Sequence, residues 1–389
     1  MKWFLWMACF WLGCVAPKQT GVDPTLPEAV RAVEALAPHD VLLSGTQSEQ
    51  PNIRARALAL LILSAPKKAG DTYALQALGD PEPWVQNAAI EALFERISET
   101  ETVERLFDYL ERTDALASAD VQGRAALRLL DVGYEDRLSS FKNRYQKYEN
   151  QPWRASPWAL LSAKMGNAEA LTMLSSILSM ADVPLEVDFF VALSRSGLAS
   201  LVAALTEGQM HVEEELALTY ALARLGLGDK SAESVFRAAL DTADESTQID
   251  AIELLSRIEG TERLLNKASS KPGIIGDIGD IARMPYALKS VDGLEKFAIH
   301  DDRFVRECAA RMARIVHPLA VKNAKRVSRQ VVKDTVQDAD PMVQMEAIRT
   351  ALAIGLTGIE SELTTALTHE LLSVRIEAAG ALSMLHPTE

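Results

Sequence analysis

The sequence predicts an all-α protein built as a solenoid of about eleven stacked helical hairpins. The first observation is a small residue that recurs 27 to 38 residues apart, and ten of its eleven positions are alanine. These positions are Ala57, Ala89, Ala125, Ala159, Val191, Ala221, Ala251, Ala282, Ala309, Ala347 and Ala378. A period of about 20–50 residues is typical of a repeat array in which each unit packs on its neighbours.

The second observation is an anchor residue four places before each of these positions, mostly apolar and β-branched. The anchors are Ile53, Val85, Val121, Ala155, Val187, Ala217, Thr247, Ile278, Val305, Val343 and Val374. Residues i and i+4 share one face of a helix. Each pair therefore predicts the buried stripe of one helix.

Composition agrees with a helical array and excludes one class of function. Aromatic residues make up 6% of the 389 residues, and no hairpin turn signal such as Asn-Gly lies between alternating runs. The formal net charge is −14. Because sequence-independent nucleic-acid binding depends on neutralising phosphates, an acidic chain of this kind is not expected to bind nucleic acid.

The chain begins with an export signal, predicted over residues 1–13. Met1 and Lys2 precede an apolar run from Trp3 to Gly13, and Cys14 follows. A run of this length is too short for a membrane span of about 20 residues. The alternatives to cleavage before Cys14 are simple secretion and an uncleaved anchor.

The residues Phe10 to Cys14 resemble the lipobox of bacterial lipoproteins. The resemblance implies that Cys14 carries lipid and that residues 14–26, which contain two prolines and a glycine, form a flexible tether. It also implies a place in the bacterial cell envelope. Val15 differs from the aspartate that resembles an inner-membrane retention signal, which favours the outer membrane.

Residues from about 50 to 386 resemble the HEAT-repeat family, and in their spacing its short, bilin-lyase-like units. Asp80-Pro81, followed by Val85, Ala89 and Leu93, matches the opening of the second helix of such a unit, and Asp340-Pro341 repeats it. The resemblance implies a right-handed solenoid over residues 27–389. With helices about 8–10 Å apart, eleven units would extend about 90–110 Å and offer a concave groove.

Two polar positions of the motif have a physical role. An aspartate before the anchor suits a helix N-cap, and a proline in the first turn loses no needed hydrogen bond. The residue after the anchor is arginine or glutamine in seven units: Arg54, Gln86, Gln122, Gln248, Arg306, Gln344 and Arg375. We expect these side chains to bridge to the cap residue of a neighbouring unit.

No catalytic motif accompanies the repeats. The sequence has no phosphate loop, no Gly-x-Ser-x-Gly elbow and no His-Glu-x-x-His. His300, Asp301, Asp302 and His369 are the residues that a HEAT-built enzyme or metal protein could use, but helix capping is the favoured interpretation of the first three. We expect neither an enzyme nor a cofactor, and read Cys308 as a small core residue.

Two segments are candidate partner-binding surfaces. The first, residues 134–158, interleaves aromatic and basic residues, as binding hot spots do. Its candidates are Arg144, Lys147, Trp153, Arg154 and Trp158. Arg144 and Lys147 are expected on one face of a helix; the alternative is that the rings pack between repeats and the cations are solvated.

The second segment is a basic stripe at helical spacing, formed by Lys322, Lys325, Arg326, Arg329 and Lys333. A solvated outer face, an acidic protein partner and anionic headgroups all remain open for it. Together these features favour a membrane-tethered scaffold or assembly factor that binds another envelope protein. No small-molecule substrate is evident.

Overall fold

The computed structural model describes residues 37–97, 100–113, 117–180, 183–286 and 291–386. This part of the chain is helical and contains no β-strand, as predicted. None of its helices is both long enough and apolar enough to cross a bilayer. The predicted signal, Cys14, the tether and the first residues of the predicted solenoid, from 27 to 36, lie outside the described residues.

The chain divides into two compact units, residues 1–105 with 287–389, and residues 106–286. Helix α6 (Thr100–Glu111) contains the boundary between them. The helices of the first unit are α2 (Pro38–Gly45), α3 (Pro51–Ser64), α4 (Lys67–Leu78), α5 (Pro83–Glu95), α18 (Leu294–Ala298), α19 (Arg303–Val316), α20 (Ala324–Thr335), α21 (Pro341–Ala353), α22 (Glu360–Ala366) and α23 (Leu372–Leu385).

The second unit contains α-helices and five short 3₁₀ turns among its described residues. Its elements are α7 (Ala119–Asp131), α8 (Glu135–Leu138), η1 (Ser139–Phe141), η2 (Arg144–Tyr148), α9 (Pro152–Lys164), α10 (Ala168–Ser179), α11 (Val187–Ser194), η3 (Ala199–Leu201), α12 (Val202–Gln209), α13 (Glu214–Gly226), η4 (Lys230–Ala232), α14 (Glu233–Thr242), α15 (Glu245–Leu255), α16 (Glu262–Ser269), α17 (Ile274–Arg283) and η5 (Met284–Tyr286).

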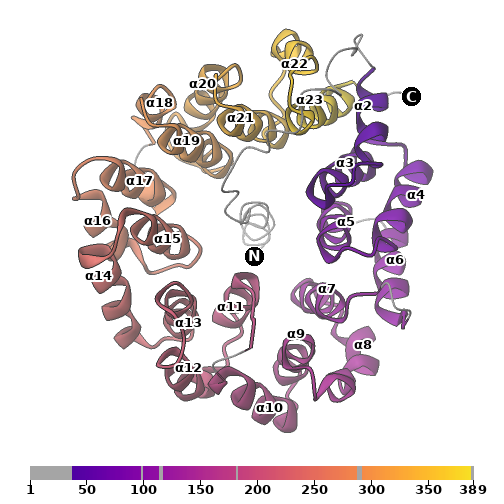
Figure 1. Cartoon of the computed structure of the whole chain (residues 1–389), viewed down its shortest axis with the longest axis vertical. Coiled ribbons are helices and arrows are strands. Elements are labelled where there is room, and N and C mark those ends of the chain that lie inside the picture. The colour runs from indigo at the N-terminus through magenta and orange to yellow at the C-terminus, as the bar shows by residue number, and fades with distance from the viewer. Residues whose placement is uncertain (1–36, 98–99, 114–116, 181–182, 287–290, 387–389) are drawn as a thin grey trace. The chain divides into compact units, whose positions relative to one another are not determined.

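In the first unit, helical hairpins from both ends of the chain form one stack. The pairs α18–α19, α20–α21, α22–α23, α2–α3 and α4–α5 each pack as a hairpin. Helix α19 packs on α21, α21 on α23, α23 on α3 and α3 on α5, so the last hairpin of the chain lies beside the first (Figure 1). A line of eleven units about 90–110 Å long, as the sequence predicted, would keep these two hairpins apart, so that part of the prediction is wrong.

Two glycines allow this junction between α23 and the first hairpin. A Cβ added to Gly45 would lie 2.7 Å from Ile376 Cδ1, and one added to Gly380 would lie 2.7 Å from Leu60 Cδ1. Leu60 and Ile376 belong to one continuous apolar core that also contains Val41 and Ala57. The small residues therefore let helices from opposite ends of the chain approach closely.

The predicted register is confirmed wherever the repeated residue is alanine. All ten of these alanines are buried, and Ala89, Ala309 and Ala347 are 0% exposed. Val191, the one exception to alanine, is only partly buried. In α11 the fully buried residues are instead Phe190 and Leu193, and the Phe190 ring lies 4.7 Å from that of Tyr220.

The predicted caps are confirmed at two helix starts. Asp302 accepts hydrogen bonds from the backbone N–H groups of Phe304 and Val305, and Asp340 does the same for Met342 and Val343. At α5 the aspartate lies two residues before the N-cap residue, Glu82, whose backbone N–H donates to Asp80 Oδ1. An N-cap acceptor of this kind stabilises a helix by about 1 kcal/mol.

Candidate functional site

The predicted aromatic-basic segment of the second unit is not a continuous helix. Residues 135–148 form α8 and the short 3₁₀ turns η1 and η2, and α9 follows. Lys147 and Trp153 are exposed, with Trp153 at 38%. The Arg154 guanidinium lies 4.6 Å from the Trp153 ring and donates to Gln151 Oε1.

Arg144 and Trp158 are structural residues, so their prediction as partner contacts is wrong. Trp158 is 0% exposed and its indole N–H donates to Ala119 O at 2.7 Å. Arg144 is 7% exposed, donates to the carbonyls of Leu110 and Arg112, and lies 4.9 Å from the Trp158 ring. The guanidinium therefore satisfies carbonyls at the end of α6, where a helix leaves acceptors unpaired.

A hollow of about 690 Å³ opens beside this buried arginine. It is lined by Glu111, Thr113, Ser140, Phe141, Asn143, Arg144, Gln146 and Lys147. Seven of these eight residues carry a polar or charged group, and Phe141 is the apolar one. The hollow, the exposed Trp153 and the half-buried Arg154 are what remains of the segment as a contact surface.

The predicted basic stripe lies on α20 and at its start, in the first unit. Lys322, Lys325, Arg329 and Lys333 are exposed. Arg326 is also exposed, but its guanidinium lies 2.7 Å from Glu295 of α18. We call Lys322, Lys325, Arg329 and Lys333 the α20 basic face.

His317, at the end of α19, lies near this face. Burial lowers the pKa of His317, and the positive charges of Arg329 and Lys325 lower it further. The lowered pKa disfavours a further positive charge on the imidazole beside these cations.

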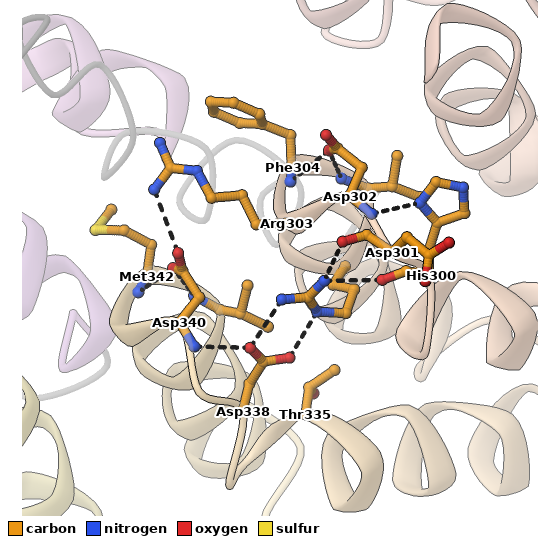
Figure 2. A network of polar contacts seen from close by, with 12 residues as sticks. His300, Asp301, Asp302, Arg303, Phe304, Thr335, Asp338, Asp340 and Met342 are labelled. Atoms are coloured by element: carbon orange, nitrogen blue, oxygen red, sulfur yellow. Dashed lines mark hydrogen bonds and ion pairs between the residues drawn. The ribbon is translucent and has the colours of Figure 1, made fainter. Parts of the chain in front are cut away.

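Arg306 bridges to the next unit as predicted, but its partner is Asp338, two residues before the cap residue Asp340, and not the cap residue itself (Figure 2). Its Nε and Nη2 atoms donate to Asp338 at 2.7 and 3.0 Å, and Nη1 donates to the carbonyls of His300 and Asp301. The hydrogen bond to Asp338 raises the pKa of Arg306. Asp338 also accepts from Asp340 N, which places it in the turn before α21.

Arg54 makes the same set of contacts as Arg306. It lies on α3, two hairpins along the stack from α21. It donates to Asp80 through Nε and Nη2, both at 3.1 Å, and through Nη1 to the carbonyls of Ser48 and Glu49. Gln86 makes the equivalent backward contact, to Asp80 O at 2.7 Å.

His300 and His369 occupy the same turn position as Asp80 and Asp338. His300 Nδ1 accepts from Asp302 N, and His369 Nδ1 accepts from Leu371 N, each at 3.0 Å. Each histidine is five residues before its anchor, as the two aspartates are. Among the described residues no group of three or more His, Cys, Asp or Glu side chains could hold a metal ion.

Sequence reasoning missed a line of ion pairs across the second helices of the first unit. Glu377 of α23 lies between Arg56 of α3 and Arg349 of α21, with Nε–Oε1 distances of 2.8 and 2.7 Å. Glu346 continues the line to Arg314 of α19 at 3.3 Å. The sequence does hold a signal for this line. A glutamate stands three residues after each of the anchors Val343 and Val374, and Arg56 stands three residues after the anchor Ile53.

Cys308 is partly exposed and not a fully buried core residue. Its neighbour Ala309 is the residue at the close helix approach, and Cys308 lies beside that stripe. The difference follows from helical geometry, since adjacent residues are about 100° apart around the axis.

Comparisons with known proteins do not place the chain in a family. No family model matches it, and no curated protein matches it. One solved structure, a crystal structure of an engineered protein from the Northeast Structural Genomics Consortium, is 19% identical over 90% of this chain and 99% of its own, with a TM-score of 0.27. A likeness at that score carries no argument about fold or function.

Proposed function

We propose that the protein is a lipid-anchored scaffold of the bacterial cell envelope, a HEAT-like, right-handed α-solenoid of about eleven hairpins that binds another envelope protein. The signal over residues 1–13 exports it, Cys14 carries the lipid, and the tether from residue 14 to 26 leads to the helical body. The anchor favours the outer membrane. No step of this function is enzymatic.

The proposal rests on the structural roles that the polar side chains have in the described helices and turns. The histidines and aspartates that could serve chemistry act as turn acceptors, as His300 does for Asp302 N. The arginine at the start of a helix joins neighbouring units, as Arg306 does with Asp338. Side chains used in this way build a scaffold, and its free surface is left for binding.

The exposed residues Lys147 and Trp153 are the contact site that we assign to the partner. Tryptophan and cations are enriched at binding hot spots, and the neighbouring Arg154 extends the same surface. Lys147 contributes mainly to the rate of association, an effect that salt weakens.

The test is capture of the partner by crosslinking and pull-down from native membranes. The variant Lys147→Glu/Trp153→Ala is expected to recover at least tenfold less partner than the parent, since one hot-spot side chain is worth more than about 1.4 kcal/mol. The matched control is Lys230→Glu/Met210→Ala, which changes an exposed lysine and a methionine that is 72% exposed in the same unit. Equal recovery by the two variants would remove this contact site.

Two further measurements test the rest of the proposal. Cys14→Ser is expected to abolish lipid labelling and release the protein from membranes; membrane residence with unchanged mobility would instead mean an uncleaved anchor. Elemental analysis of the purified protein is expected to find no stoichiometric metal. One bound ion per chain would favour the alternative, a HEAT-built enzyme or metal protein that uses His300, Asp301, Asp302 or His369.

A further inference from the structure

The α20 basic face is a concentrated positive surface in an acidic protein. No acidic residue lies between Lys322 and Lys333 in the sequence. Its four members are exposed: Lys325, Arg329 and Lys333 recur every four residues on one side of the helix, and Lys322 stands just before the N-cap residue Asn323. The face therefore presents several charges together at one surface.

The helix holds this face in a fixed direction. Its opposite side buries Val327, Val331, Val332 and Thr335, each 0 % exposed. Helix α20 packs on α18, α19 and α21. The cations therefore stand on a packed element and cannot turn inward.

Acidic side chains beside the face already have partners of their own. Glu295 pairs with Arg326, Asp292 accepts from Asn323 Nδ2, and Asp334 accepts from Gln330 Nε2. Across the helix pair, Glu307 of α19 pairs with Arg311. None of these four carboxylates forms an ion pair with a member of the face in the described structure.

The composition of the α20 basic face favours binding to a charged membrane surface over binding to a groove of another protein. Three of its four members are lysine, which is depleted at protein interfaces, and α20 contributes no exposed large apolar residue that could act as an anchor. Clusters of basic residues on a helix are typical of binding to anionic lipid headgroups.

The position of the face in the chain agrees with such a surface. The proposed lipid at Cys14 is followed by 22 residues before the first described residue, Ala37, and α2 begins at the next residue. A chain of that length reaches about 75 Å at most. One hairpin, α22–α23, separates α20–α21 from α2–α3 in the stack, which at about 10 Å per helix is well within reach.

We propose that the α20 basic face rests on the anionic phospholipid headgroups of the membrane that holds the lipid anchor. The inference relies on the proposed function for the anchor alone. Each lysine or arginine near an anionic surface strengthens binding by about fivefold, so loss of three of them weakens the contact by roughly 100-fold. Because the contact is electrostatic, salt at about 0.5 M disrupts it.

The experiment reconstitutes the full-length lipidated protein into vesicles of phosphatidylcholine, alone or with about 30% phosphatidylglycerol. A membrane-impermeant amine reagent then labels lysines, and mass spectrometry reads each site. At low salt, labelling of Lys322 is expected to fall several-fold on the phosphatidylglycerol vesicles. Labelling of Lys68 and Lys230, exposed lysines of other elements, is expected to stay unchanged.

Two variants with the same change in net charge complete the test. Lys325→Glu/Arg329→Glu/Lys333→Glu keeps Lys322 as the reporter and is expected to abolish its protection. Lys68→Glu/Lys230→Glu/Arg263→Glu alters two lysines and one arginine that are exposed elsewhere and is expected to preserve it. Circular dichroism verifies that both variants stay helical.

The outcomes separate this inference from the anchor. Equal Lys322 labelling on the two kinds of vesicle at low salt would overturn the headgroup contact while leaving the anchor intact. Protection that appears only after a membrane extract containing proteins is added would overturn it in favour of an acidic protein. Failure of the protein to remain with either vesicle would refute the anchor itself.

Discussion

Glu377 and Arg56 form a two-pronged ion pair across 321 residues of sequence. Arg56 Nε lies 2.8 Å from Glu377 Oε1, and Nη2 lies 2.7 Å from Oε2. The Glu377 side chain is 1% exposed and also accepts from Arg349. One buried carboxylate thus joins three helices, α21 through Arg349, α23 through Glu377 itself and α3 through Arg56.

Replacing this carboxylate is expected to destabilise the protein more than a surface substitution would. Glu377→Ala leaves two partly buried arginines without their shared partner, which costs about 2–4 kcal/mol. Urea denaturation of the variant measures the loss. Arg326→Ala, which breaks the exposed pair with Glu295, serves as the control and is expected to cost less than about 1 kcal/mol.

The same pair predicts how stability depends on pH. Burial raises the pKa of Glu377, but the charges of Arg349 and Arg56 outweigh it and hold the net pKa below its usual value. As pH falls, the unfolded chain takes up this proton first, near pH 4.3, so the contribution is complete above that pH and is lost as pH falls through the folded pKa.

Glu377→Gln isolates this contribution, since it keeps the shape of the side chain and cannot ionise. The difference in unfolding free energy between parent and variant is expected to be constant from pH 7 to about pH 5 and to shrink below that. A difference that grows on acidification would contradict the assigned sign.

The bridge at Arg306 predicts a graded response to substitution. Arg306→Ala removes both the bond to Asp338, which is 9% exposed, and those to the carbonyls of the preceding turn, at about 2–3 kcal/mol. Arg306→Gln is expected to cost about half as much, because Gln86 makes the equivalent backward bond. Thermal unfolding ranks the variants, and equal losses would mean that the backward bond contributes nothing.

The hollow in the second unit supplies a matched pair of cations. Arg144→Ala removes the side-chain donor to the buried carbonyl of Leu110 and one of two donors to the carbonyl of Arg112, which also accepts from Gln122 Nε2, with an expected loss of about 2–4 kcal/mol. Lys147→Ala, on the exposed side of the same turn, is expected to change stability by less than about 0.5 kcal/mol. Chemical denaturation compares them. Loss of stability in both variants would show that Lys147 is also structural.

The buried alanine of each repeat is expected not to tolerate replacement by a larger residue. Ala89→Leu adds a bulky side chain at a fully buried site of α5, where overpacking costs about 1–3 kcal/mol. Glu95→Leu in the same helix starts from an exposed residue and is the control. Similar shifts in melting temperature would show that Ala89 does not lie at a close approach.

The helical class and its buried stripe were predictable because one alanine per unit is read directly from the sequence. The register failed at Val191, where aromatic rings replace small residues and Phe190 packs in a different direction. The junction of α23 with α3 could not be predicted, since contacts between distant segments leave no local periodicity.

The candidate surfaces show the same limit. The residues of the α20 basic face were predicted from helical spacing, whereas Arg144 and Trp158 have the composition of a contact surface and are buried. Arg144 and Trp158 are buried because they donate hydrogen bonds to the backbone carbonyls of Leu110, Arg112 and Ala119. A sequence does not show which carbonyls remain unpaired.

The contact between the last and first hairpins determines when the first hairpin can complete its packing during synthesis. Arg56 is synthesised 321 residues before Glu377, which at about 5–20 residues per second is a delay of roughly 15–60 s. During that interval the face of α3 that α23 covers, with the apolar Leu60 on it, has no cover from its native neighbour. The first helices of the chain thus complete their packing only when its last helix arrives, and a chaperone that shields nascent apolar surface would have its longest task at the beginning of the protein.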